Sequence, residues 1–229
     1  MKKMSLLVGS VLSVLGASST EAQSCTSSFG QVPGIPANTW GNTVPTNRAV
    51  YNNCVTDLVL GLAARPRGTG NPAVTDDGVS TYFVQAGPDV STSPAAGAGF
   101  GTWNFAFYVG GANAGQYSYK LRYDFNGATG NTLDLGLVAW SNAAYANSWN
   151  LGMGFLGASA PGITPPSGPS FNPNSGGEYS FALEAYSGES MVASTNMTVV
   201  SSVPEPSSYA LVAAGLAGLV AVRRRRRSA

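Results

Sequence analysis

The side chains that could carry out chemistry in this chain are carboxylates, because the sequence contains no histidine. Without an imidazole the chain by itself cannot form a Ser-His-Asp triad or a Cys-His pair. The remaining catalytic arrangement is a pair of carboxylates, as glycoside hydrolases use. The carboxylates considered for such a pair are Asp76, Asp77, Asp124, Asp134, Glu178, Glu184 and Glu189. Their spacing does not show that any two converge, so we expect a domain that is not an enzyme.

Several of these carboxylates have a simpler interpretation. Asp124 shares the polar phase of an expected strand with Lys120 and Arg122, which predicts a solvated face or cross-strand pairs. Glu184 and Asp134 are interpreted in the same way. The segment Asp76-Asp77-Gly78 offers oxygen ligands for calcium, but it lacks the alternating acids of a calcium loop. A turn is the favoured interpretation there, and no cofactor is expected.

Three aromatic side chains are candidates for stacking against sugar rings: Trp140, Tyr145 and Tyr186. Trp140 and Tyr186 fall in the opposite phase to the apolar face of their expected strands, and Tyr145 lies in an Asn- and Ala-rich segment expected to be a loop. All three could therefore be exposed. The alternative is burial in the core, which is the common fate of large aromatic rings.

The two cysteines, Cys25 and Cys54, predict a disulfide bridge if the chain is exported, because an even number of thiols pairs readily in an oxidising compartment. Such a bridge would stabilise the fold by about 3–4 kcal/mol in the chain-entropy model. Zinc ligation is the weaker alternative, since two thiols without histidine make a poor site.

Apolar and polar residues alternate with a period of two along the body of the chain, which predicts strands. The clearest alternation covers residues 103–109 and 117–125, and the glycine-containing segment 110–115 between them predicts a hairpin. Further strands are expected at 58–62, 79–84, 133–137, 149–155, 179–183 and 191–200. Seven to nine short strands predict an all-β fold, an antiparallel β-sandwich resembling a jelly roll.

Both ends of the chain differ from this body. Lys2 and Lys3 precede an apolar stretch from Met4 to Leu15, and small residues with a candidate cleavage site at Thr20-Glu21-Ala22 follow. This pattern predicts a secretory signal peptide over residues 1–22, read by the secretion machinery, in preference to a retained anchor. The sandwich is then expected over residues 23–202, flanked by the signal helix and by a C-terminal apolar helix.

The C-terminal segment, residues 203–229, has three successive parts. Pro204, Glu205 and Pro206 should hold the backbone extended, because proline fixes φ and lacks an N–H. An uncharged apolar run over residues 209–222 should enter a bilayer as a helix, although at about 21 Å it is short against a hydrocarbon core of about 30 Å. The last part is a row of arginines expected to stop transfer and stay cytoplasmic, namely Arg223, Arg224, Arg225, Arg226 and Arg227.

This order of parts resembles the PEP-CTERM sorting signal of Gram-negative bacteria. The resemblance implies that Pro204, Glu205 and Pro206 are recognised by a membrane transpeptidase-like enzyme, exosortase, and that the protein is associated with exopolysaccharide at the cell surface. An ordinary tail anchor with a proline-rich linker is the alternative. The body, from Ser148 to Phe155 and from Gly176 to Phe181, more weakly resembles a recurrent group of such exported proteins, which brings no activity with it.

Removing both ends changes the charge that a partner would meet. Five basic and nine acidic residues remain between Gln23 and Val203, which leaves a net charge of −4. No basic patch is available for phosphates, so nucleic-acid binding is not expected. The sequence therefore predicts an exported protein of the cell envelope, outer surface or extracellular matrix, transiently anchored in the inner membrane. Its domain is expected to be structural or adhesive; the alternatives are a carbohydrate-binding module and, third, a carboxylate-pair glycoside hydrolase.

Overall fold

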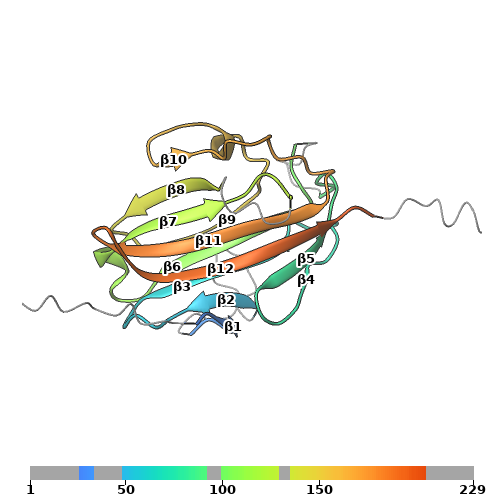
Figure 1. Ribbon diagram of the computed structural model, residues 1–229. Helices are drawn as coiled ribbons and strands as arrows, with labels where there is room; N and C mark the ends of the chain where they lie inside the picture. The colour runs from blue at the N-terminus through green and yellow to red at the C-terminus, as the bar shows by residue number, and fades with distance from the viewer. Residues whose placement is uncertain (1–25, 34–47, 92–98, 129–134, 205–229) are drawn as a thin grey trace, which may run out of the picture.

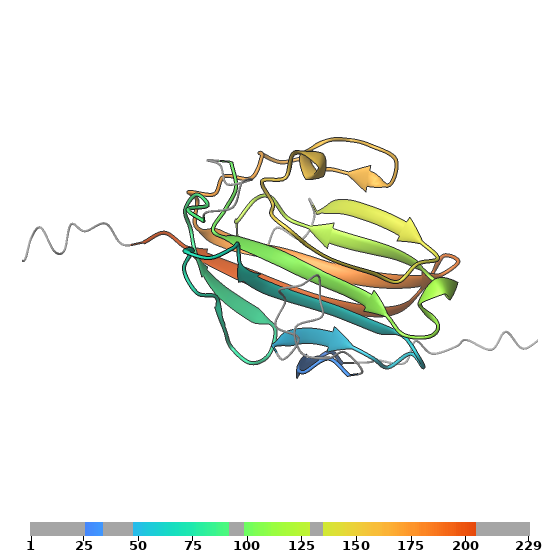
Figure 2. The same ribbon diagram turned by 180° about the vertical axis from the view of Figure 1, so that it is seen from behind.

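The computed structural model describes residues 26–33, 48–91, 99–128 and 135–204. In these residues twelve strands form two sheets, and the only helices are two short 3-10 turns, η1 (Ala114–Gln116) and η2 (Gly154–Gly157). Figure 1 faces the larger sheet, and Figure 2 shows the smaller sheet from behind. The predicted all-β class is confirmed. The two flanking helices fall outside the described residues, so they stay predictions.

The smaller sheet has five strands, in the order β1 (Ser28–Gly30), β2 (Ala49–Asn52), β3 (Val59–Pro66), β6 (Trp103–Gly110) and β9 (Tyr145–Trp149). The larger sheet has seven, in the order β10 (Ile163–Thr164), β8 (Gly136–Ser141), β7 (Ser118–Tyr123), β11 (Gly177–Ser187), β12 (Ser190–Ser202), β5 (Thr81–Gln85) and β4 (Thr75–Asp76).

Period-two alternation explains how the two sheets share one core. In β7, Tyr119, Leu121 and Tyr123 are buried and alternate with half-buried polar residues. The aromatic rings of the two sheets meet between the layers, where the ring centroids of Phe105 in β6 and Phe181 in β11 lie 4.8 Å apart. Full burial of each such ring stabilises the fold by about 1.5–3 kcal/mol. The sheets therefore pack face to face, which is the layer arrangement of a sandwich.

The predicted wholly antiparallel pairing is wrong at one position. β5 and β12 are parallel, with Tyr82 opposite Val199 and Gln85 opposite Ser202. A parallel neighbour requires a long crossover, and the chain between these strands passes through both sheets. The sequence predicted seven to nine strands and a resemblance to a jelly roll, whereas the described residues form sheets of five and seven strands with a parallel pair.

The predicted hairpin between β6 and β7 is also wrong, because these strands belong to different sheets. Gly111 has a φ of +101°, and η1 then carries the chain across to the larger sheet. A Cβ on Gly111 would lie 2.2 Å from the carbonyl oxygen of Asp57, so the crossing requires a glycine. Local alternation predicted both strands correctly but could not show that they lie in separate layers.

The segment around Trp149 differs from the predicted strand over 149–155. Trp149 ends β9, and the following residues form a turn and then η2. The buried side chain of Asn150 accepts a hydrogen bond from the backbone N–H of Gly152 at 3.0 Å, which favours the turn over an extended chain. Tyr145, expected in a loop, begins β9. The strands predicted at 58–62, 79–84, 103–109, 179–183 and 191–200 are confirmed within a few residues.

Candidate functional site

The last strand of the larger sheet delivers the chain to its C-terminal segment. β12 ends at Ser202, whose carbonyl oxygen accepts a hydrogen bond from the backbone N–H of Ala86 at 2.8 Å. Val203 and Pro204 then leave the sheet (Figure 1). Glu205, Pro206, the apolar run at 209–222 and the arginines at 223–227 lie outside the described residues. Among the described residues no helix is long and apolar enough to cross a membrane.

A groove of about 480 Å³ lies where the chain leaves the sheet, and we call it the exit groove. Its apolar lining comes from three segments: Pro72, the loop after β5, and the first two residues after β12. The apolar lining residues are Pro72, Ala86, Pro88, Val90, Val203 and Pro204. Val90 is 63% exposed and Val203 is 55% exposed, so apolar surface at this end of the sheets faces outward.

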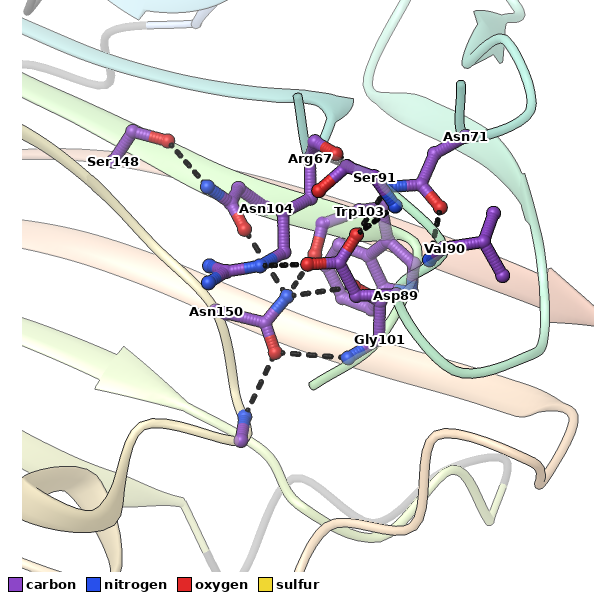
Figure 3. A network of polar contacts seen from close by, with 11 residues as sticks. Arg67, Asn71, Asp89, Val90, Ser91, Gly101, Trp103, Asn104, Ser148 and Asn150 are labelled. Carbon is purple, nitrogen blue, oxygen red and sulfur yellow. Dashed lines mark hydrogen bonds and ion pairs between the residues drawn. The ribbon is translucent and has the colours of Figure 1, made fainter. Parts of the chain in front are cut away.

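A buried polar network holds the loop that carries Val90 (Figure 3). Arg67 Nε donates to Asp89 Oδ2 at 2.7 Å, and Asn71 Nδ2 donates to Asp89 Oδ1 at 2.6 Å. The backbone N–H of Ser91 also donates to Asp89 Oδ1, at 2.9 Å, and that of Val90 donates to Asn71 Oδ1, at 3.1 Å. The loop is thereby tied through the Asp89 carboxylate to Arg67 and Asn71, which follow β3.

The charge on Asp89 is maintained by these donors. Burial by itself raises the pKa of a carboxyl group, but hydrogen bonds from Asn71, Ser91 and Arg67 outweigh it and lower the pKa of Asp89 to about 2. The Arg67 guanidinium also lies 4.2 Å from the ring centroid of Phe100. The sequence analysis missed this network, because Arg67 and Asp89 are remote in sequence. The available signal for their pairing was a basic and an acidic residue, each beside a turn rich in proline and glycine.

A second set of hydrogen bonds, made by the side chain of Asn150, holds the start of β6 in the smaller sheet (Figure 3). Its Nδ2 donates to the carbonyl oxygens of Trp103 at 2.6 Å and Gly101 at 3.0 Å, and lies 3.1 Å from Asn104 Oδ1. Its Oδ1 accepts from the backbone N–H of Gly101 at 3.0 Å. The start of β6 is therefore anchored to the turn after β9.

A second groove, of about 360 Å³, is lined by aromatic rings between β8, β9 and η2, and we call it the aromatic groove. Trp140 and Tyr145 meet there at a centroid distance of 5.8 Å, and Trp149 and Phe155 at 5.1 Å. Tyr145 and Phe155 are each 39% exposed. The structure thus brings together two of the three predicted sugar-contact residues and adds two that the sequence analysis did not name.

The predicted strand phase of Trp140 is wrong, and its side chain is half-buried. Trp140 pairs with Tyr119 across β7 and β8 and stacks on its ring at 5.4 Å, so it packs against the core. Val138 and Trp140 form the inner phase of β8, whereas Leu137 lies opposite Arg122 on the outer phase. The leucine run that set the predicted phase therefore points away from the core at its described end. Trp140 Nε1 is buried without a hydrogen-bond partner in the described residues.

Tyr186 lies on the outer face of the larger sheet, away from the aromatic groove. Its hydroxyl donates to Glu184 Oε2 at 2.7 Å, and Lys120 Nζ lies 4.1 Å from its ring centroid. Glu184 also accepts from Arg122 Nε at 2.9 Å across β7 and β11. The cross-strand pairing predicted for this face is confirmed, and it occupies the carboxylate of Glu184.

Three other predicted carboxylates, Asp76, Asp77 and Asp124, have structural contacts, whereas Glu178 lies half-buried in β11 and Glu189 lies exposed in the turn between β11 and β12. Asp76 forms an ion pair with Arg48. Asp77 Oδ1 accepts from the backbone N–H groups of Val79 and Thr81 at 2.8 and 3.0 Å, which lowers the pKa of Asp77 to about 2 and matches the predicted turn. The prediction for Asp124, a solvated or cross-strand-paired position on a strand, is wrong: Asp124 follows the end of β7, is buried, and accepts a hydrogen bond from the backbone N–H of Asn126 at 2.7 Å. Asp134 lies outside the described residues.

The predicted metal ligands and the predicted disulfide bridge lie only partly within the described residues. The described residues contain no group of three or more His, Cys, Asp or Glu side chains that could hold a metal ion. Cys54 lies in the exposed segment after β2, where its backbone N–H donates a hydrogen bond to Asn52 Oδ1 at 3.1 Å. Cys25 lies outside the described residues, so its bridge to Cys54 stays a prediction.

The fold and the exit together define a β-sheet domain whose last strand runs directly into a C-terminal targeting segment. Residues 202–227 match the family model of the PEP-CTERM protein-sorting motif. The chain therefore carries this sorting motif, which implies processing by exosortase-type machinery and direction to the cell surface. No curated protein and no solved structure matches the chain.

Proposed function

We propose that this protein is a non-catalytic structural or adhesive component of the outer surface or extracellular matrix, associated with exopolysaccharide and released from the membrane by processing at its tail. The observation that supports this most is the direct continuation of β12 into the sorting motif at Ser202. Because no linker separates the sheet from the motif, the folded domain is itself the cargo of sorting.

The export route we propose uses both ends of the chain. Residues 1–22 direct secretion, the domain crosses the membrane, and the apolar run at 209–222 followed by Arg223–Arg227 halts transfer. Pro204, Glu205 and Pro206 are then presented to the processing enzyme.

A non-catalytic role is supported by the contacts of the described carboxylates. Glycoside hydrolysis needs two carboxyl groups, about 5–10 Å apart, on either side of the glycosidic bond. One of them must be free to ionise and the other must be able to donate a proton. Asp76, Asp89 and Glu184 instead each receive a hydrogen bond from an arginine. These contacts occupy carboxylate oxygens that a hydrolase would need free for its substrate.

Intact-mass analysis and C-terminal peptide mapping of the protein from its native host test this proposal. Loss of the segment beyond about Pro206 in the wild type, and its retention when Pro204, Glu205 and Pro206 are changed to alanine, are expected. A wild-type chain that still ends at Ala229 would instead indicate a permanently anchored protein and would refute release by processing.

Carbohydrate binding in the aromatic groove is the second candidate function. It is favoured by the convergence of Trp140, Tyr145, Trp149 and Phe155, since exposed ring faces can stack on sugars. Loss of one aromatic contact worth about 0.5–1.5 kcal/mol should weaken binding roughly 2- to 12-fold.

Retention on purified exopolysaccharide measures this effect. Tyr145→Ala should weaken retention, whereas Tyr186→Ala on the outer face is the matched control. Equal retention of both variants and the wild type would remove the groove from consideration. Release of reducing sugar would instead support the glycoside hydrolase.

A further inference from the structure

The exit groove has a composition suited to an apolar environment. Val90 and Val203 expose more than half of their surface, and none of the residues that line the groove is charged. Pro72, Pro88 and Pro204 also lack a backbone N–H, so three donors that would otherwise need solvation are missing from its lining.

Several of the remaining backbone donors around the groove are satisfied within the protein. The N–H groups of Ala86 and Gly87 donate to the carbonyl oxygens of Ser202 and Pro173 at 2.8 and 2.7 Å. The N–H of Val90 donates to Asn71 Oδ1 at 3.1 Å. Removal of water from this surface therefore leaves these donors paired, which avoids the main cost of placing a loop in an apolar medium.

The buried ion pair fixes the shape of this surface before any contact is made. Arg67, directly after β3, pairs with Asp89 in the loop, and Asp89 also accepts hydrogen bonds from Asn71 and Ser91 (Figure 3). A contact made by the groove would therefore order few additional groups and would lose little conformational entropy.

The sequence that follows the groove places a bilayer within reach. Four residues, 205–208, lie between Pro204 and Tyr209, where the apolar run begins, and the five Cα-to-Cα steps across them span at most about 17 Å. The polar headgroup layer occupies roughly 5–7 Å of that length. Because Val203 and Pro204 themselves line the groove, the groove is the part of the described domain nearest to the inserted tail.

We infer that the exit groove rests on the outer lipid surface of the membrane while the sorting tail is inserted. This inference rests on the proposed membrane-anchored intermediate. A short tether raises the effective concentration of the bilayer at the groove, so a weak contact by a few exposed apolar side chains is sufficient. The contact would hold the domain in one orientation and keep the motif at the membrane surface until the tail is removed.

A lipid surface is favoured over the processing enzyme as the occupant because the tether brings lipid to the groove in every anchored molecule. The enzyme must instead bind the extended motif, of which Pro204 alone lies in the groove lining among the described residues. Contact with the enzyme is therefore an outcome of the test that would overturn the inference.

Quenching of tryptophan fluorescence by phosphatidylcholine vesicles with brominated acyl chains tests the inference on the full-length chain. Val90→Trp and Val203→Trp each place a reporter in the groove, and Val79→Trp is the matched control. Val79 is 66% exposed, close to Val90, but it lies at the opposite end of β5. The emission added by the two groove reporters should be lost in brominated vesicles, while that added by Val79→Trp should persist.

Flotation of the same vesicles separates this inference from the proposal on which it rests. A chain that does not float with the vesicles would refute membrane anchoring and the inference with it. A chain that floats while the groove reporters are unquenched would overturn the inference alone. If, in addition, Val90→Asp slows tail removal in the native host and Val79→Asp does not, the groove contacts the processing enzyme.

Discussion

Replacement of Arg67 by methionine should destabilise the domain strongly, because it leaves the Asp89 carboxylate buried without its cation. The Asp89 side chain has no exposed surface and that of Arg67 is 9% exposed. Removal of one partner of a buried ion pair costs about 3–5 kcal/mol. Asn71 and Ser91 still donate to Asp89 in the variant, so we expect a loss near the lower end, about 3 kcal/mol.

The pH dependence of this loss provides a separate test of its cause. The wild-type pKa of Asp89 lies below its ordinary value of 3.8, at about 2, so the ionised carboxylate stabilises the fold above pH 3.8 and that contribution is lost as pH falls toward 2. This shift corresponds to about 2 kcal/mol. Loss of Arg67 raises the pKa of Asp89, so the stability difference between wild type and Arg67→Met should shrink between pH 5 and about pH 3.

Urea denaturation followed by tryptophan fluorescence measures both effects. Arg48→Met is the comparison variant: the Arg48 side chain is 54% exposed, so solvent screens its ion pair with the buried Asp76 carboxylate and its loss should cost less than the loss of Arg67. Replacing both charged partners with apolar residues, in Arg67→Met/Asp89→Leu, should cost less than Arg67→Met alone. The reasoning is refuted if Arg67→Met costs no more than Arg48→Met, or if its cost is unchanged at pH 3.

Three further predictions concern the rest of the domain. Gly111→Ala should cost about 2–4 kcal/mol in urea denaturation, because it combines a positive φ with a backbone clash, whereas Gly154→Ala, with no atom within 4 Å of its Cβ, should cost under about 1 kcal/mol. Asn150→Ala should cost about 2–3 kcal/mol by leaving the carbonyl oxygens of Gly101 and Trp103 without their donor; a near-neutral effect would contradict this. Burial raises the pKa of the phenols Tyr119, Tyr123 and Tyr179 to about 12, so the melting temperature should begin to fall above the ordinary value of 10, and a flat profile to pH 12 would be inconsistent.

The strands were largely predictable because their information is local. In β7 and β11 the buried positions alternate with half-buried ones, as the period-two pattern of these segments requires. The phase was correct where one face was clearly apolar, but it failed in β8, where the two phases carry leucines on one side and Val138 and Trp140 on the other. In such a strand the pairing with the neighbouring strand determines which side faces the core. Here Trp140 lies opposite the buried Tyr119 and stacks on its ring, so the side of β8 that carries Trp140 faces the core.

The candidate sites were also predictable only in part: some of their residues could be named from the sequence, but the way these residues come together could not. Trp140 and Tyr145 were predicted as aromatic contacts, and their convergence with Trp149 and Phe155 depends on β8 and β9 lying in different sheets. The exit groove could not be predicted, because it combines Pro72, Val90 and Val203 from three distant segments. Only the parallel pairing of β5 with β12 brings the loop after Gln85 beside the start of the sorting motif.

The sequence by itself determined the absence of histidine chemistry, the all-β class and the sorting motif at residues 202–227, because composition, side-chain alternation and a linear recognition segment require no knowledge of distant contacts. The tertiary structure alone decided that β6 and β7 lie in separate sheets, that Trp140 faces the core and that Arg67 is paired with Asp89. These features depend on which segments pair and stack, and pairing between remote segments is set by the packing of the whole core rather than by local preference.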